Sequence, residues 1–389
     1  MTFRTAWFRI SSTLLLAYLG LFVILSVDVI ARLWSVRSGM GSAFEAALVL
    51  CYQAGHAMIT LFGMVLAARM LLRERTPATR AFGLMLAFLT LWYAMAFAFT
   101  AFPGRFQSWL AANLFELGLP SRVAGLFFDS PWWPAWLALA ACVRVSVLYP
   151  QPVTSEAIAA AGQRDRTGLM RSVACAGVDV GAVWRTAAAF LLQRGLLRGA
   201  VVWPAALALG LASALLAAPS NALLPVYALF GAGAAIVITN VRAGMGVATA
   251  LARRRILWIV QAALTAVIAF LVAGVLSFPD DGAASVLSFA LTAVAPLAVM
   301  TGIALAARAS HPPDPRQAVR NTASRGTVAF ACAAAYVIVQ SLTSSTGGPA
   351  VLGSMLGFLA AIATGVLVWR RARASMVRLI TPAFARPES

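Results

Sequence analysis

Apolar stretches long enough to cross a bilayer alternate along this chain with short arginine-bearing segments, and this alternation most constrains its fold. A helix needs about 20 predominantly apolar residues to cross a hydrocarbon core about 30 Å thick. Ten such stretches are predicted, at 11–32, 46–68, 81–102, 132–149, 200–218, 223–241, 257–278, 286–307, 326–343 and 350–369. Backbone groups in lipid must hydrogen-bond within the protein. The sequence therefore predicts an all-α, polytopic integral membrane helix bundle with about ten transmembrane helices.

The positive charges fall mostly on one side of this predicted arrangement. All 30 basic residues are arginines, and 26 of them lie in segments that would share a side with both chain ends. The opposite side carries the other four, Arg32, Arg37, Arg105 and Arg122. Because cytoplasmic loops carry the excess of basic residues, both termini are predicted to be cytoplasmic. The first span follows Arg4 and Arg9 without an early cleavage pattern, so we expect a retained anchor in a bacterial cytoplasmic (inner) membrane.

The composition excludes an ordinary soluble domain, because 61% of the residues are hydrophobic and only 11% are charged. The net charge of +18 is explained by arginines beside membrane spans, so anionic membrane lipids are the expected partners. Nucleic acid is not expected, because binding it requires a basic face on a folded soluble domain. The four cysteines are dispersed and predict neither a disulfide framework nor a zinc site.

One transmembrane domain is predicted over 1–369, followed by a short basic cytoplasmic tail at 370–389. The outer loop, 103–131, is rich in Trp and Phe, which is typical of an interfacial belt and also fits an apolar lid over a ligand pocket. The inner loop, 150–199, ends in a stretch at 183–194 with arginines recurring on one side. That pattern predicts a helix lying in the inner interface, held by membrane adhesion or serving as a docking surface.

Catalytic motifs are scarce. The chain has no lysine, no HExxH, no GxSxG and no GxGxxG that follows a strand. Its two histidines are His56, inside the second predicted span, and His311, in an inner loop. The pair Asp280 and Asp281 lies in a Pro-Asp-Asp-Gly stretch that indicates a turn. We therefore predict a non-enzymatic protein with no catalytic residues, no metal site and no cofactor.

Ionisable and amide side chains inside the first two spans form the main candidate site. Such groups are costly at membrane depth, so they normally face the bundle interior and have a partner. With two residues of the outer loop, the predicted ligand-binding set is Asp28, Glu45, Gln53, His56, Trp109 and Glu116. The alternative is that the intramembrane members only form interhelical hydrogen bonds that hold the bundle together.

The last predicted span contains a small-residue motif and leads into a basic segment. Gly353 and Gly357 form a GxxxG, which lets two helices approach closely and favours a homodimer through this helix. The arginines that follow are the predicted contact for a cytoplasmic signalling protein: Arg370, Arg371, Arg373 and Arg378.

Five stretches, read in order, resemble the membrane region of polytopic bacterial sensor histidine kinases of the competence-pheromone-receptor type. They are 147–152 (VLYPQP), 252–260 (ARRRILWIV), 295–298 (APLA), 318–325 (AVRNTASR) and 368–380 (VWRRARASMVRLI). The resemblance implies a sensory membrane module that signals through its last helix. The chain departs from the family because it stops at Ser389, where a phosphoacceptor region and an ATP-binding domain would follow. We therefore expect a sensor module without a kinase domain, which acts on a partner.

Two other classes compete with this interpretation. A small-molecule or lipid transporter would suit ten spans, and Pro296 in the middle of the eighth span is positioned to break that helix at a binding site. A membrane-embedded enzyme acting on lipid would need carboxylates or histidines clustered at one interface. The outer-side carboxylates are instead scattered across several loops.

Overall fold

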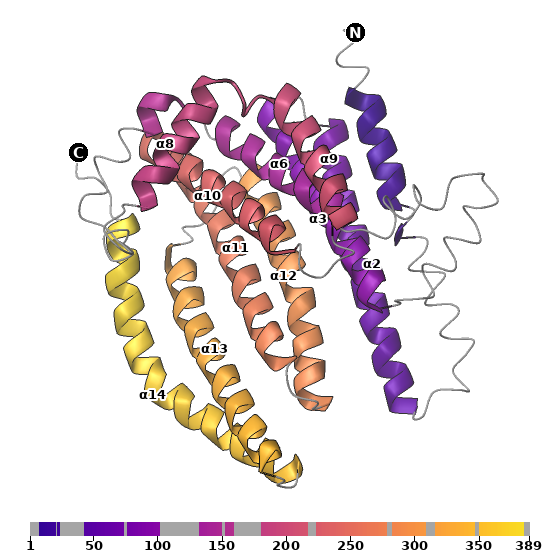
Figure 1. Ribbon diagram of the computed structural model, residues 1–389, viewed down its shortest axis with the longest axis vertical. Helices are drawn as coiled ribbons and strands as arrows, with labels where there is room; N and C mark the ends of the chain where they lie inside the picture. The colour runs from indigo at the N-terminus through magenta and orange to yellow at the C-terminus, as the bar shows by residue number, and fades with distance from the viewer. Residues whose placement is uncertain are drawn as a thin grey trace, which may run out of the picture. The chain divides into compact units, whose positions relative to one another are not determined.

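The computed structural model describes residues 8–20, 22–23, 43–73, 76–101, 132–149, 152–158, 180–216, 223–277, 282–308, 316–346 and 350–384. Helices make up nearly all of these ranges, and no β-strand occurs within them. The predicted all-α class is confirmed for this part of the chain. The helix Phe8–Gly20 comes first, in indigo in Figure 1. It is followed by α2 (Ala43–Arg73), α3 (Pro77–Ala101), α6 (Trp132–Leu148), α8 (Val180–Gln193), α9 (Gly199–Leu216), α10 (Leu223–Val247), α11 (Ala250–Leu276), α12 (Gly282–Arg308), α13 (Arg316–Ser345) and α14 (Ala350–Phe384).

Six of the described helices contain segments long and apolar enough to cross a membrane. These segments are Gln53–Leu72, Pro77–Ala96, Ala228–Met245, Ala250–Leu276, Asn321–Thr343 and Leu352–Trp369. Shorter apolar helices occur at Phe8–Gly20, Trp132–Leu148, Gly199–Leu215 and Ala290–Ala306. Each of the ten predicted stretches thus overlaps one apolar helix, and six of those helices reach spanning length.

The helices extend beyond the predicted spans into the arginine-bearing segments. The helix predicted from 326 begins at Arg316, and the one predicted from 257 begins at Ala250. The last predicted span, 350–369, lies within α14, which continues to Phe384. An apolar window detects only the part of a helix that suits the hydrocarbon core. The helical hydrogen bonds of the backbone continue past the apolar window, because long arginine side chains can place their charge in the headgroup region while the backbone stays helical.

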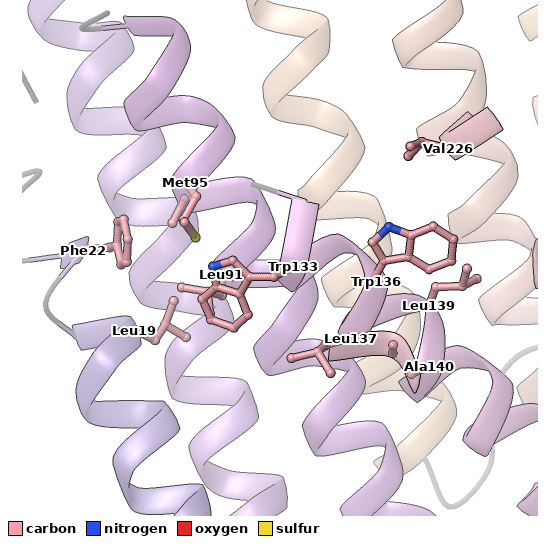
Figure 2. Close-up of a cluster of buried hydrophobic side chains, with 12 residues drawn as sticks. Leu19, Phe22, Leu91, Met95, Trp133, Trp136, Leu137, Leu139, Ala140 and Val226 are labelled. Atoms are coloured by element: carbon pink, nitrogen blue, oxygen red, sulfur yellow. The ribbon is translucent and has the colours of Figure 1, made fainter. Parts of the chain in front are cut away.

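The chain divides into two compact units, Met1–Ala248 and Thr249–Ser389. In the first unit α3 packs against α2 and α6, and α6 packs against α9 and α10. Its largest apolar cluster joins residues of the N-terminal helix, α3, α6, α9 and α10. Figure 2 shows Leu19, Phe22, Leu91 and Met95 gathered around Trp133. The sequence prediction of one domain over 1–369 concerns the membrane region as a whole and stays a prediction.

The second unit is built from two helix pairs, α11 with α12 and α13 with α14, and α11 also packs against α13. Figure 1 shows α13 and α14 running side by side. Glycines permit the close approach of these helices. A Cβ on Gly302 would overlap Ala262 on α11, and one on Gly357 would lie 3.0 Å from the carbonyl oxygen of Tyr336 on α13. Small residues at helix contacts are typical of packing between helices in lipid.

Several helices expose many large apolar side chains, unlike the helices of a typical soluble protein. Polar residues are buried on the same helices that expose large apolar ones: on α2, His56 is 3% exposed while Met58 is 70% exposed. On α10, Asn240 is fully buried while Ile238 is exposed. In water such surfaces would be costly, whereas in lipid the apolar face is solvated and the polar groups need partners inside the bundle. This pattern agrees with helices that are long and apolar enough to span a membrane.

Candidate functional site

The buried polar face of α2 contains Gln53 and His56, two members of the predicted ligand-binding set. Gln53, His56 and Thr60 follow one another at helical spacing and are all buried. The hydroxyl of Thr60 donates to the backbone carbonyl of His56 at 2.9 Å, within the same helix. This bond engages the Thr60 hydroxyl within α2 itself. The Gln53 amide and the His56 imidazole are therefore the groups of this face that are suited to contacts with other helices.

His56 meets Tyr93 on α3. The Tyr93 hydroxyl and His56 Nδ1 are hydrogen-bonded, and the two rings stack with centroids 5.3 Å apart and planes 26° from parallel. Tyr93 is buried, and Thr90, one turn earlier on α3, is fully buried with its hydroxyl bonded to the Leu86 carbonyl at 2.7 Å. The His56–Tyr93 pair therefore lies in the contact between α2 and α3, and both of its side chains are buried.

The chain brings these two residues together through the short turn between Arg73 and Pro77. In an antiparallel helix pair, residues equally far along the chain from the turn lie at the same depth. His56 and Tyr93 are at nearly equal distances from this turn. His56 can be identified from the sequence as an ionisable residue in an apolar span, whereas Tyr93 is one aromatic residue among many in its span. The position of the turn between Arg73 and Pro77 is the signal that pairs the two residues.

The pair can hold a proton in two arrangements. With neutral imidazole, Tyr93 donates its O–H to an unprotonated Nδ1, or an Nδ1–H donates to the phenol oxygen. Interconversion changes the tautomer of the imidazole and the direction of the bond without moving either helix. Chemically, the arrangement is suited to a conformational or protonation-dependent contact between α2 and α3.

The other members of the predicted set are placed less fully. Asp28, Trp109 and Glu116 lie outside the described residues. Glu45 belongs to the first turns of α2, about three turns from His56 along the same helix. The four predicted partner-contact arginines all belong to the last part of α14, which is helical there. The proposed joint ligand site of all six residues therefore stays a prediction.

Two further buried polar contacts tie α6 to its neighbours. Trp136 Nε1 donates to the Ser213 hydroxyl on α9 at 2.9 Å, and Asn240 Nδ2 on α10 donates to the Ser146 hydroxyl at 3.2 Å. In the second unit, Gln261 Nε2 on α11 donates to Thr322 on α13 at 2.5 Å. These contacts fit the structural alternative of the sequence analysis, in which polar groups hold helices together.

One feature predicted for the second unit differs from what the structure contains, and the GxxxG motif is placed within the chain. Pro296 was expected to be positioned to break its helix, yet α12 runs without interruption from Gly282 to Arg308. A proline in lipid is tolerated where local adjustment satisfies the freed carbonyl. The GxxxG of the last helix faces α13: Cβ atoms on Gly353 and Gly357 would contact Thr343 and Tyr336. A homodimer through α14 stays a prediction and would have to use another face.

Comparison of the chain with protein-family models, curated proteins and solved structures gave no match.

Proposed function

We propose that this chain is a non-catalytic, multi-pass protein of the bacterial cytoplasmic membrane that perceives a signal within its helix bundle and passes it to a cytoplasmic protein. In this proposal about ten helices cross the membrane and both termini are cytoplasmic. The arginine asymmetry supports that orientation, since 26 of the 30 arginines would then face the cytoplasm.

The observation that carries the proposal is the length of α14. This helix has 35 residues, so it is about 52 Å long at about 1.5 Å per residue. Its apolar part, Leu352–Trp369, suits a hydrocarbon core about 30 Å thick. The remaining turns continue from Arg370 to Phe384 without a break. A continuous helix can transmit a shift or rotation of its membrane part to the surface beyond the lipid.

The His56–Tyr93 contact supplies a candidate element for the sensing step. A buried hydrogen bond between two helices has a small net free energy, so a ligand or proton that competes for the imidazole could change the packing of α2 against α3. The transporter alternative receives less support, because the helix break expected at Pro296 is absent from the continuous α12.

Site-specific photo-crosslinking in intact cells tests the proposal. A photoreactive amino acid replaces Met376, in the arginine-bearing part of α14, and in a matched variant it replaces Leu359, which is exposed within the apolar part. We expect a covalent adduct with a cytoplasmic protein at position 376 and none at position 359. Replacing the four arginines by glutamine should remove the adduct, because the contact is electrostatic in part.

The identity of the adduct separates the functional classes. A histidine kinase or response regulator supports the sensor proposal, whereas a transport ATPase would replace it with transport. The absence of any protein adduct at position 376, with the protein correctly inserted, would refute signalling through this helix.

A further inference from the structure

The corner where α8 meets α9 combines exposed apolar side chains with arginines from two parts of the chain. One face of α8 packs inward, where Ala188 and Leu192 contact Val153, Ile158 and Ala243. The opposite face exposes Val183 and Phe190, and Leu196 and Val201 remain exposed as the chain enters α9. The predicted helix near 183–194 is confirmed as α8. One of its faces packs against the rest of the unit, and the other is exposed.

The turn between the helices brings arginine side chains over this apolar surface. The helix α8 ends in a Schellman arrangement, with Leu196 N–H bonded to the Leu191 carbonyl and Gly195 at φ 69°. The guanidinium of Arg198 folds over Gly195, where its Cζ would lie 3.4 Å from a Cβ at that position. The guanidinium of Arg194 lies 5.5 Å from the centre of the Phe190 ring.

Arg144 reaches the same turn from α6. Its Nη1 donates to the Leu197 carbonyl at 2.7 Å, in a half-buried position. A Cβ on Gly199 would lie 3.8 Å from Arg144 Nε and 3.5 Å from Trp203 Nε1, so both groups flank the start of α9. One carbonyl accepts from only one of the five N–H groups of a guanidinium. Arg144 therefore retains capacity to bind an anion.

No carboxylate belongs to the segment that forms this corner. Residues 180–216 include Arg185, Arg194 and Arg198 and neither aspartate nor glutamate. No carboxylate of α8 or α9 is therefore present to neutralise the charges of Arg194 and Arg198. A surface that is apolar and positively charged at once is complementary to a molecule with an apolar part and an anionic head.

We propose that the α8–α9 corner, defined by Arg144, Phe190, Arg194, Leu196, Arg198 and Val201, is a binding site for an anionic phospholipid. The lipid phosphate contacts the arginines, and the acyl chains lie along the exposed apolar residues. An anionic lipid is preferred over a zwitterionic one, because the latter brings an ammonium group that the arginines repel. This site is independent of signalling through α14, so either proposal can fail without the other.

Native mass spectrometry of the full-length chain tests the site. The protein is released from a mild detergent containing equal amounts of phosphatidylglycerol and phosphatidylcholine, and the retained lipids are counted. We expect the unchanged protein to retain phosphatidylglycerol preferentially. In the Arg144→Gln/Arg198→Gln variant this preference should fall by about tenfold, because each basic group near a lipid surface contributes to the attraction. The Arg144→Lys/Arg198→Lys variant should keep most of it.

The Arg254→Gln variant is the matched control, because it removes an exposed arginine from α11 in the other unit. It should leave the preference unchanged. Equal loss in this control, or an unchanged preference in the glutamine double variant, would overturn the proposal. A large excess of inorganic phosphate should leave the lipid bound, since phosphate lacks the apolar part. Complete displacement by phosphate would refute a lipid site in favour of a simple anion site.

Discussion

Tyr93 on α3 is hydrogen-bonded through its hydroxyl to Nδ1 of His56 on α2, and the two rings stack at 5.3 Å. Both residues are buried within the first unit, and α2 exposes large apolar side chains such as Met58 on its other face. His56 is the one basic residue in the second predicted span, 46–68, and it has a specific partner on the next helix. A polar pair of this kind stabilises the helix contact and also gives a ligand or proton a point at which to weaken it.

A double-mutant cycle measures this contact. Tyr93→Phe, His56→Leu and the double variant are compared by the free energy of unfolding in mixed micelles. We expect a coupling free energy of about 0.6 kcal/mol, with about 1.7 kcal/mol as the upper range for hydrogen bonds between membrane helices. A coupling of zero would mean that the two side chains do not interact in the folded protein.

Close helix packing in the second unit predicts opposite effects for two glycines of the α11–α12 pair. Gly302→Ala should destabilise by about 1–3 kcal/mol, because the new methyl overlaps Ala262 and lies near the Trp258 carbonyl. Gly274→Ala is the matched control, since no atom lies within 4 Å of its added Cβ. It should be neutral or stabilising by up to about 1 kcal/mol, because alanine favours the helix. Thermal unfolding of both variants in detergent checks this, and equal shifts would contradict the packing.

The helical class and the approximate positions of the helices could be predicted from the sequence, because an apolar run and its flanking arginines are local properties. The helix ends could not. Hydropathy falls at Arg316 and at Arg370, yet the backbone stays helical at both, since continuing a helix requires only its internal hydrogen bonds. Local composition therefore locates the membrane part of a helix and underestimates its full length.

Of the two residues in the candidate site, only His56 could be predicted from the sequence. His56 is conspicuous because an ionisable group in an apolar span is costly, whereas Tyr93 is conspicuous only once the pairing of α2 with α3 is known. The same applies to Gly357: the motif indicates close packing, but the sequence does not say whether the partner is α13 or a second chain. Partner identity depends on helix pairing and register, which local patterns do not encode.

The contact of Gly357 with α13 predicts that its substitution affects stability and leaves the oligomeric state unchanged. Gly357→Ala should destabilise by about 1–3 kcal/mol, because a Cβ there lies 3.0 Å from both the ring and the carbonyl oxygen of Tyr336. Gly231→Ala, with open space around its added Cβ, is the control. Light scattering after size exclusion and thermal unfolding are measured on the same samples. Dissociation of an oligomer by Gly357→Ala without loss of stability would instead place this glycine between two chains.

The proposed orientation predicts that the turn before α3 and the end of α11 lie on opposite sides of the membrane. Thr76 and Ser277 are both exposed at helix ends, so each can be replaced by cysteine after the four native cysteines are changed to alanine. A membrane-impermeant maleimide applied to spheroplasts should label Ser277→Cys and not Thr76→Cys, because the arginines near Thr76 favour the cytoplasm. Both should be labelled once the membranes are broken, which controls for the reactivity of each thiol. Labelling of Thr76→Cys but not of Ser277→Cys in intact spheroplasts would invert the topology. Labelling of both would place the two positions on the same side, which requires an even number of crossings between them in place of the five predicted, so the spans from α3 to α11 would have to be reassigned.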